Sequence, residues 1–321
     1  MNEKLKVSVI IMTLNAENFI KNTLEILLQQ TRKPDEIIVA DSESDDCTRE
    51  IASKFEKVKI LNIRRKEFDH GGSRDYALKN SSGDIILFFT QDAVITQEDY
   101  IERMIKNFDD KEVAMVCGRQ IPKPDSSPYE RLIREYNYPN IRKVNTKADI
   151  KKKNIKTFYM SDVCSAYRRD IYLELGGFEH PILTNEDMLI AAQALFNGYK
   201  TVYDPTVRVL HSHNFSCKQE YMRNFDVAAF MKMHESVFEG MKIEGEGIRL
   251  VQYVSKELLK HFQVIWFVRF GFICVAKYLG NLRGRKYAGM SYEKLCKHSA
   301  SKNYWIKYKT ENLDYIEGKT V

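Results

Sequence analysis

The feature that most constrains the fold is an alternation of strand and helix patterns over the first 120 residues. Such alternation predicts a parallel, doubly wound sheet with helices on its faces. The turn after the first strand pattern, Thr13-Leu14-Asn15-Ala16-Glu17-Asn18, contains neither GxGxxG nor GxxxxGK, which disfavours dinucleotide and P-loop sites. Apolar, β-branched strand patterns occupy residues 7–12, 36–40, 58–62 and 84–89, and helix patterns occupy residues 16–30, 46–55 and 73–79.

The chain length and the cysteines indicate a cytoplasmic protein of one large or two modest domains. A chain of 321 residues buries a sizeable core. Its six cysteines are scattered without a CxxC pair, which argues against a zinc knuckle or a disulfide framework and fits a reducing cytosol. The apolar run near the N-terminus is too short for a signal peptide, so we interpret it as the first strand.

The middle of the chain changes character at residues 119–156, which contain four prolines and the basic run Lys151-Lys152-Lys153. We interpret this part as a long, partly ordered excursion. It either lies over a binding site or is a solvated loop. An extended piece at 159–165, a helix at 169–175 and a Gly-Gly-Phe turn are expected after it.

From Cys217 onward the chain is predicted to be helical. Its most apolar segment, residues 262–279, contains Arg269 and Lys277, so it makes a poor transmembrane helix. Two interpretations stay open: a buried helix, or an amphipathic helix lying in a membrane interface. Residues 251–310 hold 12 Lys and Arg against two acids, and this local balance of +10 exceeds the net charge of +6. An anionic partner is therefore expected there.

Two segments combine into a candidate site. Residues 185–211 place the acidic pair Glu186-Asp187 at a helix start, followed by a glycine turn and a strand that ends on His211. Alone, the acidic pair is a common charge at a helix N-terminus. However, an earlier buried strand runs into Thr90-Gln91-Asp92, and polar strand tips are where open α/β sheets bind ligands. Together the segments supply a metal carboxylate, a general base and a histidine ligand.

In their order along the chain, these motifs resemble the family-2 glycosyltransferases with the GT-A fold. The resemblance covers about residues 7–215 and rests on VSVIIMTLNAENFI, QTxxPxEIIVADSxSxD, GGSRDYAL, TQDA, LGGFE, NEDMLIAAQALFNGYK and VRVLHSH. The variants FDHGGSRD, TQDA and HSHNFS resemble the bacterial rhamnosyltransferase branch. That branch builds O-antigen, capsule or other surface polysaccharide from dTDP-L-rhamnose on a lipid-linked acceptor.

The resemblance implies an α/β protein with the GT-A fold: a Rossmann-like, mostly parallel sheet flanked by helices, with a C-terminal helical extension. Residues 1–215 are expected to form the catalytic domain, with a nucleotide-sugar-binding half at 1–93 and an acceptor half at 94–215. Residues 216–321 are expected to contact a membrane interface or a second subunit, such as in a homodimer. Because the donor motifs all lie before His213, deleting residues after about Gly240 is expected to cost membrane binding more than nucleotide binding.

For the donor, the resemblance implies that Asp41 accepts the N3–H of uracil or thymine; the alternative is a cap for the following turn. Arg74 is expected to reach the nucleotide, the alternative being a surface ion pair. The turn His70-Gly71-Gly72 is expected to allow close backbone approach to the diphosphate or sugar. The full predicted donor set is Thr13, Asn15, Glu17, Asp41, His70, Gly71, Arg74, Gln91 and Asp92.

For the chemistry, the resemblance implies a divalent cation, Mg²⁺ or Mn²⁺, held by Asp92 and His211. Asp92 is the surviving carboxylate of a degraded DxD motif, and Mg²⁺ tolerates few protein ligands. His213 lies two residues on, on the same side of an extended chain, and is a further candidate. Asp187 is implied as the general base, with an ordinary pKa near ~4. Glu186 is expected to orient it or to bind the acceptor.

The function expected on this basis is inverting transfer of L-rhamnose from dTDP-L-rhamnose to a hydroxyl of a lipid-linked glycan, at the inner face of the plasma membrane. A UDP-sugar donor is an alternative. A pyrophosphate-forming nucleotidyltransferase is disfavoured, because no Gly-rich basic signature follows the first strand. A non-catalytic or weakened sugar-nucleotide-binding protein is supported only by the degraded DxD motif. Nucleic acid is not an expected partner.

Overall fold

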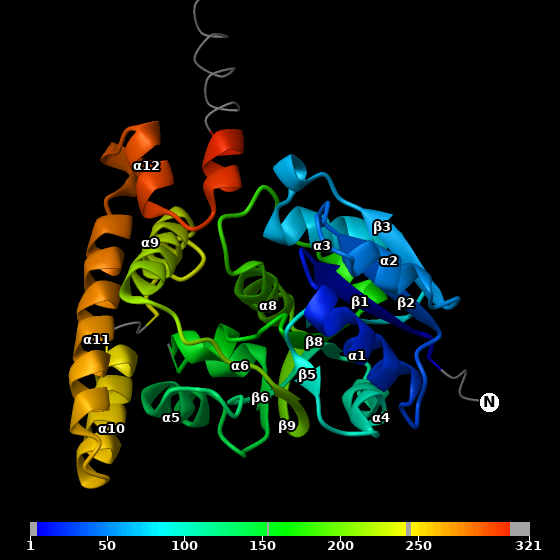
Figure 1. Ribbon diagram of the computed structural model, residues 1–321, viewed down its shortest axis with the longest axis horizontal. Coiled ribbons are helices and arrows are strands. Elements are labelled where there is room, and N and C mark those ends of the chain that lie inside the picture. Colours follow the sequence, from blue (N-terminus) through cyan, green and yellow to red (C-terminus); the bar gives the residue numbers. More distant parts are fainter. Residues whose placement is uncertain (1–4, 153, 242–244, 309–321) are drawn as a thin grey trace, which may run out of the picture.

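A nine-stranded sheet organises the molecule in a computed structural model that describes residues 5–152, 154–241 and 245–308. The strand order is β3-β2-β1-β4-β8-β6-β9-β5, and β7 pairs with β9. Helices cover both faces of the sheet, and further helices follow at the C-terminal end (Figure 1). The strands are β1 (Val7–Thr13), β2 (Glu36–Asp41), β3 (Val58–Asn62), β4 (Ile85–Thr90), β5 (Val94–Ile95), β6 (Val113–Ile121), β7 (Lys143–Asn145), β8 (Cys164–Arg168) and β9 (Lys200–Leu210).

The central strands are apolar on both sides because both sides are covered. All seven residues of β1 are buried. Its alternate side chains enter two cores: Val9 packs with helix α1 (Glu17–Leu28), and Ile10 packs with helices α3 (His70–Lys79) and α8 (Glu186–Phe196). Burial on both faces explains the nearly continuous apolar runs of the sequence. The helices of this part are α1 (Glu17–Leu28), α2 (Thr48–Ser53), α3 (His70–Lys79), α4 (Tyr100–Lys106), α5 (Pro128–Asn137), α6 (Lys147–Ile150), α7 (Arg169–Glu174) and α8 (Glu186–Phe196).

The sheet is mixed. Strands β3, β2, β1 and β4 are parallel to one another, and so are β6 and β9. Strand β8 lies between these two groups and runs antiparallel to both β4 and β6. Its register places Cys164 opposite Phe89. The start of β8 therefore lies beside the end of β4, at the edge where the parallel strands also end.

Helix α3 begins at His70, three residues before the predicted start. Asp69 caps it, because its Oδ1 accepts a hydrogen bond from the Gly72 amide at 2.7 Å. The predicted turn at 70–72 is therefore the first turn of a helix. A Cβ at Gly71 would lie 2.3 Å from the carbonyl oxygen of Glu179, so this glycine allows the chain around Glu179 to approach the helix.

The predicted excursion at 119–156 is more regular than expected. It begins with the end of β6 and continues into α5, β7 and α6. Ser127 caps α5 through its side chain, and Pro128 occupies the first turn, where a missing amide proton costs nothing. Pro128 thus starts a helix, whereas Pro122, Pro124 and Pro139 lie in the connections before and after it.

The C-terminal helices are α9 (Cys217–Met233), α10 (Glu246–Lys260), α11 (Val264–Gly284) and α12 (Tyr292–His298). Helix α11 packs closely on α9. A Cβ at Gly280 would lie 2.2 Å from the carbonyl oxygen of Tyr221, and one at Gly284 would lie 2.2 Å from that of Phe225. Phe270 and Ile273, in its first half, pack on α5 and α10. The opposite side of α11 is exposed, with Ile265 77% and Phe272 65% accessible. The helix is therefore buried along one side only.

Candidate active site

The predicted site residues meet at one edge of the sheet. Strand β1 ends at Thr13, which pairs with Asp41 at the end of β2. Asp92 follows the end of β4, and His211 follows the end of β9. This edge, where the parallel strands end, is the usual ligand site of an α/β sheet.

A cavity of about 280 Å³ lies at this edge. Four of the predicted donor residues line it. The lining residues are Met12, Thr13, Leu14, Ser42, Arg65, Phe68, His70, Arg74, Thr90, Gln91 and Asn303. Five other predicted donor residues are not part of this lining: Asn15, Glu17, Asp41, Gly71 and Asp92.

Asp41 lies behind the cavity wall and is fully buried. Its carboxylate accepts hydrogen bonds from Thr13 Oγ1 at 3.0 Å and from the amide and hydroxyl of Ser44 at 2.9 and 2.5 Å. It therefore caps the turn after β2, the alternative that the sequence left open. Its contact with a pyrimidine base stays a prediction.

Asn15 and Glu17 join the first loop to the turn after β2. Asn15 Oδ1 accepts from the Asp45 amide at 2.8 Å, and Glu17 Oε2 accepts from the Cys47 amide at 3.1 Å. Gln91 holds the same loop from the other side. Its side chain accepts from the Leu14 amide at 2.7 Å and donates to the Leu14 carbonyl at 3.1 Å. Gln91 thus shapes the cavity that it lines.

Asp92, His211 and His213 form a cluster suited to a cation. Asp92 Oδ2 lies 3.4 Å from the Nε2 atoms of both histidines, and the three ligand atoms lie within 4.8 Å of one another. Gln120 Oε1 accepts from Arg134, a donor-only side chain, and lies 2.9 Å from Nδ1 of His211. Nδ1 must therefore carry the proton, which leaves the Nε2 lone pair facing Asp92. In this tautomer the Nε2 lone pair of His211 and the Asp92 carboxylate face each other as two acceptors, so a cation between them would satisfy both, while Gln120 holds the ring in place.

The charge states of the cluster agree with this role. Burial lowers the pKa of His211. Burial and the neighbouring His211 lower the pKa of His213 to about 4. Neutral imidazoles are the form that binds metals. Burial opposes ionisation of Asp92, but the neighbouring His211 in its protonated form and Lys123 Nζ at 3.3 Å hold the pKa of Asp92 below its usual range.

A second cluster gathers three carboxyl groups around Arg74. Arg74 Nη1 lies 2.9 Å from Glu186 Oε1, and Arg74 Nε lies 3.4 Å from Asp162 Oδ2. Asp187 Oδ2 accepts a hydrogen bond from the Asp162 amide at 3.2 Å. Arg74, Glu186 and Asp162 are buried, so the ion pair is an interior one and not the surface pair that the sequence left open.

This crowding changes the acid strength of Asp187. Burial and the negative charges of Asp162 and Glu186 raise the pKa of Asp187 well above its usual value. Burial also raises the pKa of Asp162, although Arg74 opposes the shift. The ordinary carboxylate pKa that we expected for Asp187 from the sequence is therefore too low. A carboxylate with a raised pKa is a stronger base.

The backbone brings the two clusters together. The Thr90 amide at the end of β4 donates to the Val163 carbonyl, just before β8, at 3.4 Å. Asp92 follows the end of β4, and Asp162 precedes the start of β8, so both residues lie beside these paired strand ends. The chain before α8 is fixed to α3, because the Ile182 amide donates to Asp69 Oδ2 at 2.9 Å. Asp162 and Lys123 were not predicted from the sequence. The signal for Asp162 was a polar residue just before a strand, and the signal for Lys123 was its place in the proline-rich segment.

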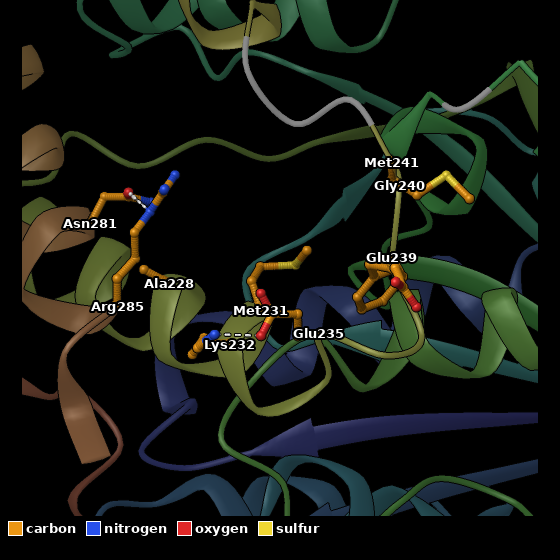
Figure 2. A pocket seen from close by; sticks show the side chains of 10 residues that line it. Ala228, Met231, Lys232, Glu235, Glu239, Gly240, Met241, Asn281 and Arg285 are labelled. Atoms are coloured by element: carbon orange, nitrogen blue, oxygen red, sulfur yellow. Dashed lines mark hydrogen bonds and ion pairs between the residues drawn. The ribbon is translucent and has the colours of Figure 1, made fainter. Parts of the chain in front are cut away.

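Another cavity, of about 480 Å³, lies between α9, residues 235–241 and the end of α11 (Figure 2). On its walls Lys232 pairs with Glu235, and Arg285 Nε donates to Asn281 Oδ1 at 2.9 Å. None of the predicted site residues lines it. The cavity of about 280 Å³ that Thr13, Arg74 and Gln91 line, the strand-edge cavity, is therefore the better candidate for the donor site.

Residues 8–176, more than half of the chain, match the family model described as glycosyl transferase family 2. The chain belongs to glycosyl transferase family 2. It is 38% identical over 322 residues to the O-antigen chain rhamnosyltransferase RfbN of Salmonella typhimurium, covering 99% of this chain and 100% of that protein. It is 37% identical to the O-antigen chain rhamnosyltransferase WbaN of Salmonella anatum, covering 91% of each chain.

Solved structures place the family-2 enzyme in the GT-A fold. The mannosyltransferase PcManGT from Pyrobaculum calidifontis, in complex with GDP-Man and Mn²⁺, superposes with a TM-score of 0.60 at 16% identity, over 88% of this chain and 89% of that chain. TarS of S. aureus, in complex with UDP-GlcNAc, superposes with a TM-score of 0.53 at 17% identity, over 90% and 93%. These likenesses confirm the predicted fold class, including the helical C-terminal extension.

Proposed function

We propose that this family-2 glycosyltransferase transfers L-rhamnose from dTDP-L-rhamnose, with inversion, to a hydroxyl of a lipid-linked glycan in O-antigen-type polysaccharide synthesis. The observation that carries the proposal is the 38% identity to an O-antigen chain rhamnosyltransferase over 99% of this chain and 100% of that one. A match over both full lengths includes the catalytic half and the C-terminal helices alike.

The strand-edge cavity is the proposed donor site. Thr13 and Ser42 lie on its β1 and β2 side, in front of Asp41, where a pyrimidine base would bind. Thr90 and Gln91 lie on its β4 side, next to Asp92. The nucleoside would therefore occupy the first part and the diphosphate the second.

Asp92, His211 and His213 would hold the divalent cation. When bound, the cation neutralises charge on the leaving diphosphate. Gln120 fixes the ring orientation and tautomer of His211, and Lys123 adds a positive charge beside the carboxylate of Asp92. The carboxylate suits either Mg²⁺ or Mn²⁺, whereas the two imidazole nitrogens favour Mn²⁺, because Mg²⁺ prefers oxygen ligands.

Asp187 is the proposed general base. It would take the proton of the acceptor hydroxyl while the diphosphate leaves on the opposite side of the sugar. Its raised pKa increases its proton affinity and keeps it ionised only above the usual range for a carboxylate. Glu186 is paired with Arg74, so its proposed role is to hold Arg74 and the start of α8 in place.

The C-terminal helices are proposed to place the enzyme at the inner face of the membrane. By length and composition α11 is also sufficient to cross a bilayer, but its packing on α9 favours an interfacial position. Its apolar side chains are exposed, and Arg283, Arg285 and Lys286 at its end are exposed as well. Apolar side chains next to basic ones fit the interface of an anionic membrane.

The test is a donor panel. The full-length protein would be incubated with Mg²⁺ or Mn²⁺, membranes containing lipid-linked glycan, and dTDP-L-rhamnose, UDP-glucose or GDP-mannose. The proposal predicts sugar incorporation with dTDP-L-rhamnose above the others, because a pocket built for a pyrimidine edge rejects guanine. Incorporation from GDP-mannose alone would remove both the pyrimidine and the rhamnose assignments. Preference for a UDP-sugar would keep the first and remove the second.

A further inference from the structure

The C-terminal segment returns to the donor half of the molecule. Residues 302–308 are helical and lie near the η1 turn (Arg65–Glu67) and α3 (Figure 1). Asn303 Nδ2 donates to the Arg65 carbonyl at 3.0 Å, and Lys307 Nζ donates to the Glu67 carbonyl at 2.9 Å. Segments more than 230 residues apart in the sequence are thus joined directly.

This segment is firmly anchored. Trp305 is fully buried in a core that includes Leu183 and Phe225. Asp226 of α9 accepts hydrogen bonds from the amides of Ala300 and Ser301, at 2.8 and 3.3 Å. The anchor therefore rests on α9 and on the chain that leads into α8.

The docked segment completes the wall of the strand-edge cavity. Asn303 and Arg65 both line it. Arg65 is held in place by Asp45 Oδ2 at 2.7 Å, in the turn after β2. On the other side of His70, Ser301 and Tyr304 line a neighbouring cavity of about 220 Å³. From the sequence we expected every donor motif to lie before His213. The structure adds Asn303, which lies after it, to the lining of the cavity.

The chemistry of Asn303 suits a nucleotide. Its amide nitrogen is fixed by the Arg65 carbonyl, which leaves Oδ1 as an acceptor without a hydrogen-bond partner among residues 5–152, 154–241 and 245–308. Arg65 supplies donors and positive charge next to it. Both side chains lie on the same lining as Ser42 and Thr13, the proposed base side.

We propose that Asn303 contacts the nucleoside of the bound donor, so that the C-terminal segment forms the outer wall of the donor site. This inference rests on the proposed function, because it assumes that the strand-edge cavity holds a nucleoside diphosphate. It also changes the expected effect of truncation: removing residues after Gly240 takes away Asn303 and costs nucleotide affinity as well as membrane binding.

The test compares full-length wild type, Asn303→Ala and Lys307→Ala by calorimetric titration with dTDP in Mg²⁺. Lys307 is the matched control, because it contacts the same turn from the same helix but does not line the cavity. Loss of one hydrogen bond predicts a Kd raised about three- to tenfold in Asn303→Ala and little change in Lys307→Ala. At saturating donor, kcat should stay near wild type, because the contact is not made at the reacting carbon. Asn303→Asp, which keeps the size of the side chain, should weaken dTDP binding further, with a loss that shrinks as salt rises.

Wild-type affinity in both Asn303 variants would overturn the inference and leave the proposed function intact. Equal losses in Asn303→Ala and Lys307→Ala would show that docking alone matters and would also overturn it. If the wild type bound neither dTDP nor UDP, the proposed function itself would fail, and this inference with it.

Discussion

Arg74 Nη1 lies 2.9 Å from Glu186 Oε1, and this contact joins the wall of the strand-edge cavity to the helix that carries Asp187. Arg74 belongs to α3, and Glu186 is the first residue of α8. A single buried ion pair thus connects the proposed donor site to the helix of the proposed base. The charges are unbalanced, because Asp162 and Asp187 add two carboxyl groups to the same cluster.

Arg74→Met should destabilise the protein strongly. Removing the guanidinium leaves Glu186 and Asp162 buried without their cation, which typically costs about 3–5 kcal/mol of unfolding free energy. Urea unfolding would measure it. Lys21→Met is the control, because Lys21 pairs with Glu25 at 3.9 Å on the exposed side of α1 and should leave the midpoint unchanged. Equal midpoints for Arg74→Met and wild type would mean that the pair contributes little to folding.

The acidic limb of the pH–rate profile should lie above the usual carboxylate range. Asp187 acts as a base only when it is ionised, and burial with the charges of Asp162 and Glu186 raises its pKa. Activity should therefore fall as the pH drops through that raised pKa, before an ordinary aspartate is protonated. The measurement is kcat/KM against pH at saturating metal. A profile that stays flat down to about pH 4 would contradict a raised pKa.

Transfer should depend on a divalent cation. EDTA should abolish or strongly reduce activity, Mg²⁺ or Mn²⁺ should restore it, and Asp92→Ala should imitate EDTA. Mn²⁺ binding followed by electron paramagnetic resonance should weaken in Asp92→Ala and His211→Ala and persist in Lys123→Ala. Full activity in EDTA would instead show that Lys123, 3.3 Å from Asp92, provides the positive charge.

Helix α11 should carry membrane binding. The full-length protein should bind anionic vesicles and dissociate as salt rises, because exposed charges are screened beyond about 10 Å at 0.1 M. Replacing Ile265 and Phe272 with serine should reduce binding. Ile141→Ser is the control, since Ile141 is 65% exposed in the catalytic part. The apolar face would instead be a subunit contact if the wild type did not bind vesicles and formed a dimer that the double variant could not form.

The fold was largely predictable, because its signals are local. The apolar, β-branched runs predicted the first four strands, and the resemblance to family-2 glycosyltransferases predicted the GT-A fold. What local patterns could not supply was the pairing of distant segments. Strand β8 lies between β4 and β6 and runs antiparallel to both. Nothing in its own five residues indicates that direction. The start of α3 was missed because glycines suggested a turn, whereas Asp69 caps a helix there.

The candidate site was predictable where it follows strand ends. The cluster of Asp92, His211 and His213 was predicted from motif positions, and the three residues do meet. The residues that escaped prediction act through long-range contacts. Asp162 contacts Arg74 and Asp187 only through the fold, and Asn303 lines the strand-edge cavity because Trp305 anchors its helix nearby. Such roles depend on the tertiary fold and leave no spacing in the sequence.

Whether Asp187 is the base beside a separately built donor site is best decided with the variant Asp187→Asn. The amide keeps the size of the side chain but cannot take the proton. The measurement pairs the Kd for dTDP in Mg²⁺ with single-turnover transfer from saturating dTDP-L-rhamnose. We expect a nearly unchanged Kd and a rate lowered by about 10² or more. A collapsed Kd together with a surviving rate per bound donor would show that Asp187 binds the donor and that the base lies elsewhere.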